Sequence, residues 1–339
     1  MNKILVFVVL IGVISCAEVQ LIATDNEYSN LFKIEVENEL TVVVTVDDFG
    51  SKLSELRFSK PYKKVVLLNT TYLSYVKVLG LERSVVGTVD CERVAGVFSG
   101  SSPSTDKKKC VGKNGVLNLE LITSLQPDLI VCNSFQAPDL KAFKNVDVLI
   151  VNEFWENHPL GRAEWLRVFG HLLGAESKSN MIFTTIIDNY QNQLQKVEKQ
   201  AVLQDKPKVY PLSRFSSNYF LPGCESLISK VLLDSKCDVH CIDSTSRSME
   251  ISKEQQMLVC GEQDYLLFFD WLPTARGYKK VVKELDVERC FKGGVIYCNT
   301  AATNYFEASI MEPDVLIKNL YQILYQNQIE TKYFTLLRE

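Results

Sequence analysis

A long stretch near the middle of the chain has the hydrophobic spacing of one amphipathic helix. Between residues 179 and 202 apolar side chains recur every three or four positions, and neither glycine nor proline interrupts the run. At roughly 1.5 Å per residue such a helix extends about 35 Å, the width of a small domain. Pro207 ends the run because its ring cannot continue a helix. The pattern predicts either a strut that joins two lobes or a long surface helix of one domain.

Strand and helix signals alternate on both sides of this helix. Residues 32–37 alternate apolar and charged side chains and residues 41–45 are all β-branched, which predicts an antiparallel hairpin. Later strands are continuous apolar runs separated by helices, a pattern typical of parallel sheets covered on both faces. We expect these strands over residues 65–68, 85–87, 129–132, 146–151, 208–212, 265–269 and 294–297. Helices are expected over residues 72–79, from 118 onward, and over 227–233, 252–257 and 313–324.

Polar segments follow the carboxyl ends of the strands in the first half of the chain. Ligands of parallel sheets bind just beyond these ends, so the segments mark the predicted site. They are residues 69–72, 88–92, 133–136 and 152–156. The stretch 91–115 is rich in glycine, serine and lysine, and we expect it to be loop.

The first residues predict an export signal. Lys3 precedes an apolar run over residues 4–14 that is too short to span a bilayer, and small residues follow it. Two processing routes fit. Residues 13–16 resemble a bacterial lipobox, which would leave Cys16 lipidated, whereas ordinary signal peptidase would cut after Cys16 or Ala17. We expect a secreted, periplasmic or cell-surface protein, which the lipobox route alone would anchor to the membrane, through a lipid on Cys16.

Charge and cysteine content add two expectations. The net charge is −4 and the longest basic run, residues 107–109, is too short to indicate nucleic-acid binding. All of the ten cysteines except Cys16 lie beyond the signal, and an exported protein meets oxidising conditions, so we expect some to pair. Two pairs bracket turn-rich or strand-to-strand segments and are the first candidates to test, although the sequence leaves the connectivity open: Cys91 with Cys110, and Cys290 with Cys298.

Several segments carry recognisable motifs. Residues 118–130 read NLELITSLQPDLI, residues 158–165 read HPLGRAEW, and residues 218–223 read NYFLPG. Residues 304–307 read NYFE, and 312–314 read EPD. These segments resemble the corresponding runs of class III periplasmic binding proteins, which serve ABC transporters for iron–siderophore complexes, haem and cobalamin.

This resemblance implies a fold, a function and domain boundaries. The fold class is α/β, with two Rossmann-like lobes of parallel strands covered by helices, joined by one long helix, and with the ligand in the cleft between them. The chain would be a monomeric exported solute-binding protein and no enzyme, capturing an iron complex (siderophore or haem) or cobalamin for an ABC permease, with no resident cofactor or metal. The domains are a signal peptide over 1–17, an N-terminal lobe over 18–175, the interdomain helix over 176–204 and a C-terminal lobe over 205–339.

Aromatic and charged residues near the predicted cleft are the candidate ligand contacts. Aromatic faces supply large contact areas, and arginine pairs with carboxylates bidentately. A lone aromatic residue could instead belong to the hydrophobic core. Arg162 and Glu164 could instead be ordinary cap and surface charges at the start of a helix. The candidates are Tyr72, Trp155, Glu156, Arg162, Arg214, Tyr219, Phe220, Trp271, Arg276, Tyr305 and Phe306.

Two glutamates match the family's permease-docking positions. The resemblance implies that Glu120 and Glu254 dock the two lobes on the permease, although each is also a first-turn glutamate that the helix dipole favours. The chain departs from the family where Cys224 replaces a second glycine after Gly223, and where Asn218 and Phe306 replace tryptophans. These changes thin the expected aromatic lining. The sequon at residues 69–71 adjoins the predicted cleft, so we expect Asn69 to be unmodified or the cleft rim to be displaced.

Two other functions fit an exported α/β chain. One is an interaction or signalling role without a transporter. The other is direct capture of Zn²⁺ or Mn²⁺, which needs several histidines and carboxylates to converge, whereas the three histidines are widely separated. Cys237 and Cys241 have no second Cys or His pair nearby, so a structural or disulfide role is expected for them.

Overall fold

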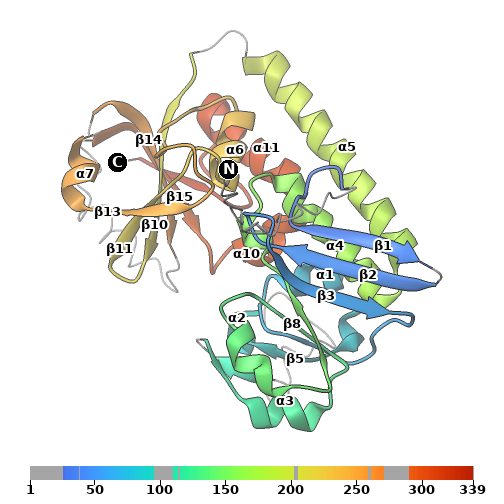
Figure 1. Cartoon of the computed structure of the whole chain (residues 1–339). Coiled ribbons are helices and arrows are strands. Elements are labelled where there is room, and N and C mark those ends of the chain that lie inside the picture. Colours follow the sequence, from blue (N-terminus) through green and yellow to red (C-terminus); the bar gives the residue numbers. More distant parts are fainter. Residues whose placement is uncertain are drawn as a thin grey trace, which may run out of the picture.

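Three β-sheets and their covering helices form two lobes (Figure 1). A computed structural model describes residues 26–37, 39–94, 110–113, 115–201, 205–258, 261–270 and 290–338. The predicted signal peptide, Cys16, Trp271 and Arg276 lie outside these residues. Among the described helices, none has the length and apolar character needed to cross a membrane.

The N-terminal lobe is built on a six-stranded sheet of order β7-β6-β5-β4-β8-β9. Neighbouring strands are parallel except β6 and β7. The strand order reverses beside β4, which pairs with β5 on one side and β8 on the other, and such sheets bind ligands beyond the carboxyl ends at this point. The strands are β4 (Val65–Leu67), β5 (Val85–Val89), β6 (Cys110–Lys113), β7 (Val116–Leu117), β8 (Leu129–Cys132) and β9 (Asp147–Ile150).

A separate three-stranded antiparallel sheet precedes this one. It comprises β1 (Phe32–Glu37), β2 (Leu40–Val46) and β3 (Lys52–Phe58), so the predicted hairpin is confirmed and extended by one strand. The two sheets are joined where the backbone N–H of Ile150 donates to Ser54 Oγ at 3.0 Å. The β2–β3 turn therefore has a fixed position relative to the main sheet of the lobe.

The C-terminal lobe contains a seven-stranded mixed sheet, in which the expected parallel strands are flanked by antiparallel ones. Its order is β13-β11-β10-β14-β15-β16, with β12 beside β10. Strand β11 runs back along β10 because Ser216, with φ of 58°, makes the tight turn between them. The strands are β10 (Lys208–Phe215), β11 (Asn218–Pro222), β12 (Asp238–Val239), β13 (Ser248–Ile251), β14 (Gln263–Asp270), β15 (Phe291–Asn299) and β16 (Thr335–Leu337).

The predicted strut is helix α5 (Glu176–Ala201), which packs on α4 of the first lobe and α11 of the second. It buries one face, formed by Ser179, Phe183, Ile186, Tyr190 and Val197. The two-lobed α/β fold with one connecting helix is therefore confirmed. The other helices are α1 (Tyr72–Leu79), α2 (Cys91–Val94), α3 (Leu119–Leu125), α4 (Pro159–Leu173), α6 (Leu227–Asp234), α7 (Lys253–Leu258), α10 (Tyr305–Ala308) and α11 (Pro313–Gln326), with short 3₁₀ turns η1 (Glu82–Ser84), η4 (Ala137–Ala142), η5 (Glu153–Trp155) and η6 (Ser309–Met311).

Two local features differ from the sequence predictions. The stretch 91–115, expected to be loop, contains helix α2 and strand β6. Helix α4 begins at Pro159, so Arg162 and Glu164 lie inside it and not at its start. His158 caps α4 by accepting the backbone N–H of Leu160 at Nδ1, at 3.1 Å. Burial lowers the pKa of His158 to about 4, which keeps that nitrogen a neutral acceptor.

Candidate ligand-binding site

A polar cavity of about 170 Å³ lies beyond the carboxyl ends of β4, β5 and β8. Segments 69–72, 88–92 and 133–136, which the sequence predicted to face a ligand, all contribute to its wall. Pockets that enclose small-molecule ligands usually measure several hundred Å³, so this cavity accommodates only part of a larger ligand. It is lined by Leu68, Asn69, Thr70, Val89, Asp90, Lys113, Gly115, Val116, Leu117, Asn133 and Gln136.

Side-chain amides hold the turn after β8 in place. Gln136 Nε2 donates to the carbonyl of Leu68 at 2.7 Å, and the backbone N–H of Asn133 donates to Gln136 Oε1 at 3.1 Å. Asn133 Oδ1 accepts the N–H groups of Phe135 and Gln136 at 3.0 and 3.1 Å. The turn is thereby tied to the end of β4, and it carries Phe135 as an outward-pointing side chain that is 75% exposed.

Three aromatic side chains form a row on the N-terminal lobe, which we call the aromatic row: Phe135, Phe154 and Trp155. The rings of Phe135 and Phe154 are nearly parallel, with centroids 6.1 Å apart, and the ring of Trp155 meets Phe154 edge-on at 5.5 Å. Phe135 follows β8, while Phe154 and Trp155 form η5 after β9, so the row adjoins the ligand-facing edge of the sheet. A partly exposed aromatic surface of this kind offers a stacking platform to a flat ligand.

Arg247 of the C-terminal lobe reaches the end of this row. Its guanidinium carbon lies 5.8 Å from the centroid of the Trp155 ring and 5.7 Å from that of Phe49. Arg247 Nη2 and Nε also donate to Asp48 Oδ2, at 2.6 and 3.2 Å. A cation, an aromatic row and a polar cavity therefore lie along the same edge of the N-terminal lobe.

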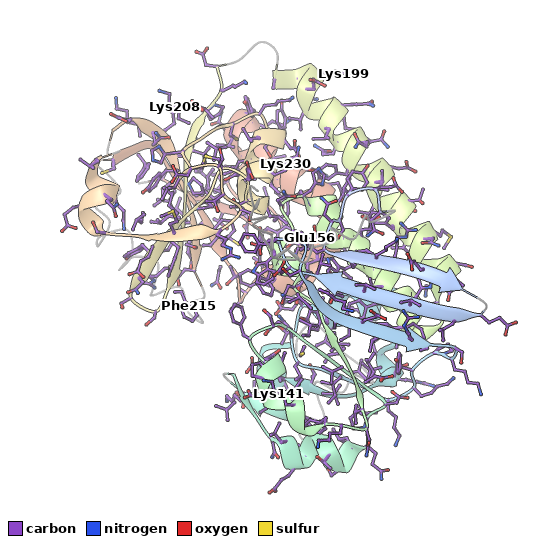
Figure 2. The ribbon with its side chains drawn as sticks, viewed as in Figure 1. Lys141, Glu156, Lys199, Lys208, Phe215 and Lys230 are labelled. Carbon is purple, nitrogen blue, oxygen red and sulfur yellow. A yellow bond between two sulfur atoms is a disulfide. The ribbon has the colours of Figure 1, made fainter. Side chains whose placement is uncertain are left out.

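The HPLGRAEW segment contributes buried structural contacts. Glu164 accepts the backbone N–H groups of Glu27, Tyr28 and Ser29 at 3.0, 3.0 and 2.8 Å. Glu156 accepts Ser29 Oγ–H at 2.5 Å and Trp165 Nε1–H at 2.8 Å. Burial raises the pKa of Glu156 to about 8, and the residue lies near the centre of the molecule between the lobes (Figure 2). Glu156, a predicted ligand contact, thus fastens the start of the described chain to α4.

Arg162 and Tyr72 also point into the protein. Tyr72 is fully buried, and its hydroxyl donates to the carbonyl of Val151 at 2.6 Å. Arg162 Nη2 lies 3.3 Å from Glu153 Oε1, which also accepts Thr71 Oγ1–H at 2.7 Å. Packing and hydrogen bonding account for both predicted contacts, although Arg162 lies close to the strand ends.

The predicted contacts of the C-terminal lobe are divided between surface and core. Arg214, at the end of β10, pairs with Asp270 at 2.6 Å. Tyr305 is buried in α10, and Phe306 is half-buried beside it. Tyr219 and Phe220 are half-buried on β11. Glu307, which follows Phe306 in α10, accepts Thr70 Oγ1–H at 2.7 Å, and this bond joins the two lobes at a residue that lines the cavity.

The predicted docking glutamates are exposed on different lobes. Glu120 lies in the first turn of α3 and Glu254 in the first turn of α7. Figure 1 shows α3 and α7 at opposite ends of the molecule. Their docking role stays a prediction.

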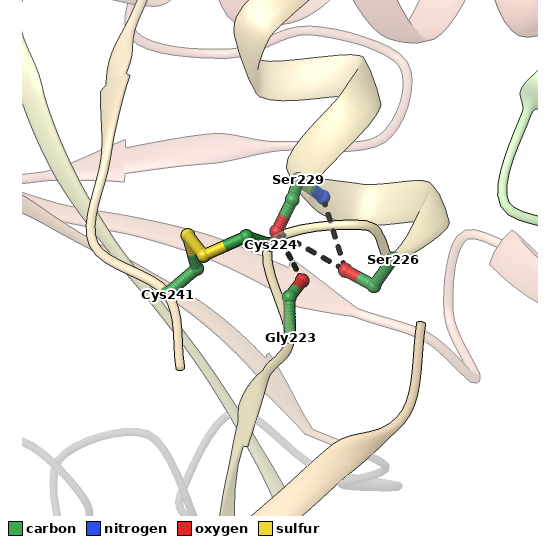
Figure 3. Close-up of a disulfide and its surroundings, with 5 residues drawn as sticks. All are labelled: Gly223, Cys224, Ser226, Ser229 and Cys241. Carbon is green, nitrogen blue, oxygen red and sulfur yellow. Dashed lines mark hydrogen bonds between the residues drawn. A yellow bond between two sulfur atoms is a disulfide. The ribbon is translucent and has the colours of Figure 1, made fainter. Parts of the chain in front are cut away.

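One disulfide of the C-terminal lobe joins Cys224 to Cys241 (Figure 3). Neither of the two candidate pairs forms a disulfide. Cys91 and Cys110 are free thiols although they lie close together, with Cys91 N 3.4 Å from Cys110 Sγ. Cys298 is a buried free thiol, whereas Cys290 is disulfide-bonded elsewhere. Spacing alone could not show that Cys224, the departure from the family's glycine, faces Cys241.

Several residues of this site were not predicted from sequence. Phe135 and Phe154 lie within the strand-end segments 133–136 and 152–156. The sequence therefore placed both residues at the predicted site without naming them as ligand contacts. Arg247 and Asp48 are 199 residues apart and meet only through the packing of the lobes. Within the described part of the chain, no group of three His, Cys, Asp or Glu side chains is arranged to hold a metal ion.

The chain has two α/β lobes joined by one connecting helix, with a candidate site at the strand ends. This is the architecture of two-lobed solute-binding proteins. A family model described as periplasmic binding protein matches residues 65–255, more than half of the 339 residues, and the chain belongs to this family. The family is one of transport binding proteins and not of enzymes, and membership implies a location outside the cytoplasm. No curated protein sequence matches the chain.

Solved structures share this fold. A periplasmic haem-binding protein from Pseudomonas aeruginosa aligns with a TM-score of 0.64 at 15% identity, covering 82% of this chain and 99% of its own. The petrobactin-binding protein YclQ from Bacillus subtilis aligns with 0.60 at 20% identity, covering 84% and 99%. IsdE of S. aureus in complex with haem aligns with 0.58 at 16% identity, covering 77% and 98%. At these identities the likeness shows the fold alone.

Proposed function

We propose that the protein is an exported solute-binding protein that captures an iron complex, haem or a siderophore chelate, and delivers it to an ABC permease. The aromatic row carries the proposal. Phe135 is 75% exposed and Phe154 37% exposed, and their nearly parallel rings lie at the edge where parallel sheets bind ligands. Stacking a conjugated ring on them removes apolar surface from water without loss of hydrogen bonds.

The polar cavity and the aromatic row suit different parts of one ligand. Asn69, Asn133 and Gln136 supply amide groups to the cavity, and its volume of about 170 Å³ suits a side arm of the ligand. The body of a macrocycle would lie outside, over the aromatic row. The haem-binding and petrobactin-binding proteins of the same fold support this ligand class. Cobalamin, another flat macrocycle, remains a candidate ligand.

Tryptophan fluorescence tests the proposal directly. Trp155 ends the aromatic row, whereas Trp165 is fully buried, so a ligand on the row should quench Trp155 first. The mature protein is titrated with haem, ferric siderophores and cobalamin, and in parallel with Zn²⁺ and Mn²⁺. We expect saturable quenching by one of the metal complexes. A response to the free ions alone would favour a direct metal-binding function, and silence throughout would favour the interaction protein.

The membrane attachment belongs to the same proposal. A lipid on Cys16 would hold the protein at the membrane near its permease, whereas cleavage after Cys16 or Ala17 would release it. Mass spectrometry of the mature N-terminus separates these routes. A diacylglyceryl mass on Cys16 supports the anchor, and an unmodified new N-terminus overturns it.

A further inference from the structure

Arg247 and Asp48 form an ion pair between the lobes. Arg247 lies in the segment between β12 and β13, and Asp48 lies in the β2–β3 turn of the small N-terminal sheet. Both Nη2 and Nε donate to Asp48 Oδ2, at 2.6 and 3.2 Å. The small sheet precedes residues 65–255, the segment that matches the family model, whereas Arg247 lies within that segment.

The β2–β3 turn does not need Asp48 for its shape. Asp47 Oδ1 accepts the backbone N–H groups of Phe49 and Ser51 at 2.9 and 2.8 Å, and these bonds close the turn. The Asp48 carboxylate instead accepts hydrogen bonds from both Nε and Nη2 of Arg247. The carboxylate therefore acts across the lobes and not within its own turn.

The backbone that carries Arg247 is held rigidly. The carbonyl of Arg247 accepts the N–H of Gly223 at 3.0 Å, and the carbonyl of Thr245 accepts that of Glu225 at 3.0 Å. A Cβ on Gly223 would lie 2.0 Å from the Thr245 carbonyl oxygen, so only glycine allows this contact. The disulfide between Cys224 and Cys241 closes the same segment (Figure 3). With the backbone fixed, the Arg247 side chain is the part that can exchange partners.

The side chain lies where the edge of a stacked ligand would come. Its guanidinium is over the ring of Trp155, the last member of the aromatic row. An exposed ion pair multiplies an equilibrium constant by about fivefold at most, because both charges are well solvated when apart. A carboxylate on a ligand that already stacks on the row would meet Arg247 at a high local concentration and would compete effectively with Asp48.

We propose that Asp48 is an internal substitute for a carboxylate of the ligand. In the ligand-free protein it pairs with Arg247, and a carboxylate at the rim of the bound iron complex replaces it. The inference rests on the proposed function and narrows its ligand to flat complexes that carry peripheral carboxylates. Displacement also frees the β2–β3 turn from the C-terminal lobe, so binding of such a ligand opens this contact between the lobes.

A comparison of haem with haem dimethyl ester tests the inference, because the two share one ring and differ only in the charge of the propionates. Affinities are measured by fluorescence and absorbance titration for the wild type, Arg247→Gln, Asp48→Asn and the double variant. We expect Arg247→Gln to weaken haem binding about tenfold, since it removes a charge-assisted hydrogen bond. Asp48→Asn should tighten haem binding about threefold, and only when Arg247 is present. Neither substitution should alter binding of the ester.

Matched controls come from the same sheet. Arg57 pairs with Glu55 at 2.7 Å and its side chain is 56% exposed, close to the 55% of Arg247. Arg57→Gln and Glu55→Gln should leave both affinities unchanged. If Asp48→Asn leaves haem binding unchanged or weakens it, the inference is wrong and the proposed function still stands. The same conclusion follows if the wild type binds the ester more tightly than haem. A wild type that binds no iron complex at all would overturn the proposed function itself.

Discussion

At the scale of single residues, the feature that asks for an explanation is the exposure of large aromatic side chains. Phe135 and Phe154 lie side by side and turn apolar surface to water, although the turn that carries Phe135 is held by three hydrogen bonds to Asn133 and Gln136. A rigid turn that presents an apolar side chain forgoes the energy of burying it. Ligand binding explains that cost, because the complex recovers the buried area.

Removal of the two exposed rings should therefore weaken binding without harming the fold. We expect Phe135→Ala combined with Phe154→Ala to reduce haem affinity by about tenfold or more, since each stacked ring contributes about 1 kcal/mol beyond area burial. Affinity is measured by absorbance titration and stability by urea unfolding. Leu258→Ala, at a position 78% exposed on α7, is the control and should change neither quantity. Equal affinity in the double variant would remove the aromatic row from the site.

Glu156 gives a prediction about pH. Burial raises its pKa to about 8, above the value near 4.3 of a glutamate in an unfolded chain. Between these two pH values the folded state holds a proton that the unfolded state has lost, so the free energy of unfolding falls as pH rises. One linked proton corresponds to about 1.4 kcal/mol per pH unit.

Glu156→Gln removes this linkage, so the variant should lose less stability than the wild type between about pH 5 and pH 7.5, by roughly 1 kcal/mol per unit. Urea unfolding at several pH values measures the difference. The exposed Glu120→Gln should run parallel to the wild type. If the Glu156→Gln profile is also parallel, Glu156 is not protonated in the folded protein.

Sequence patterns located the strand ends but could not sort the residues there. Tyr72 and Phe154 both follow strands of the first lobe, yet Tyr72 is fully buried against Val151 while Phe154 is partly exposed. The difference depends on the direction in which a single turn points its side chains. Hydrophobic periodicity along the sequence does not predict that direction. The HPLGRAEW motif was similarly correct as a family marker, whereas its Glu164 serves to hold backbone N–H groups of the early chain.

At the scale of elements, repeated hydrophobic patterns predicted most of the structure. The apolar stripe of α5 recurs over seven turns, and strands such as β8 are apolar throughout, so each follows from its own sequence. Short antiparallel strands such as β11 and β13 escaped prediction because their register depends on a tight turn and on the strands beside them. The segment that carries Arg247 likewise depends on neighbouring strands that its own sequence does not specify, and the Cys224–Cys241 disulfide holds this segment in place.

This disulfide should matter for stability and for binding together. Because it closes a loop with a sequence separation of 17, its loss in Cys224→Ser with Cys241→Ser should lower the free energy of unfolding by about 3 kcal/mol. Haem affinity should fall as well, because the segment that positions Arg247 becomes mobile. Both are measured without reductant and again with it. The difference from the wild type should vanish under reduction, and a difference that persists would mean that the serines, and not the lost bond, are responsible.

At the scale of the whole molecule, contacts on two sides set the relation between the lobes. Thr70 and Glu307 join them at the buried side, and Asp48 and Arg247 join them at the exposed side. Helix α5 spans both lobes as one continuous helix, and such a connection is stiffer than a pair of extended strands. We therefore expect ligand binding to tilt the lobes by only a few degrees, which would keep Glu120 and Glu254, the two predicted docking residues, at a nearly constant separation.

Charge reversal at these glutamates separates docking from binding. Glu120→Lys with Glu254→Lys should abolish ligand uptake through the permease and leave the affinity for the ligand unchanged, because both side chains are exposed in α3 and α7, away from the aromatic row. Transport into vesicles and fluorescence titration measure the two properties. Asp188→Lys on the exposed face of α5 is the control and should transport normally. A parallel fall in affinity would show that the glutamates act on the ligand site.

The most direct test of the account is a crystal structure of the mature protein grown with haem. We expect the porphyrin to lie between the lobes with its plane against Phe135 and Phe154, and a propionate on Arg247 in place of Asp48. A porphyrin bound elsewhere on the molecule, or one that leaves the aromatic row exposed to solvent, would contradict the account.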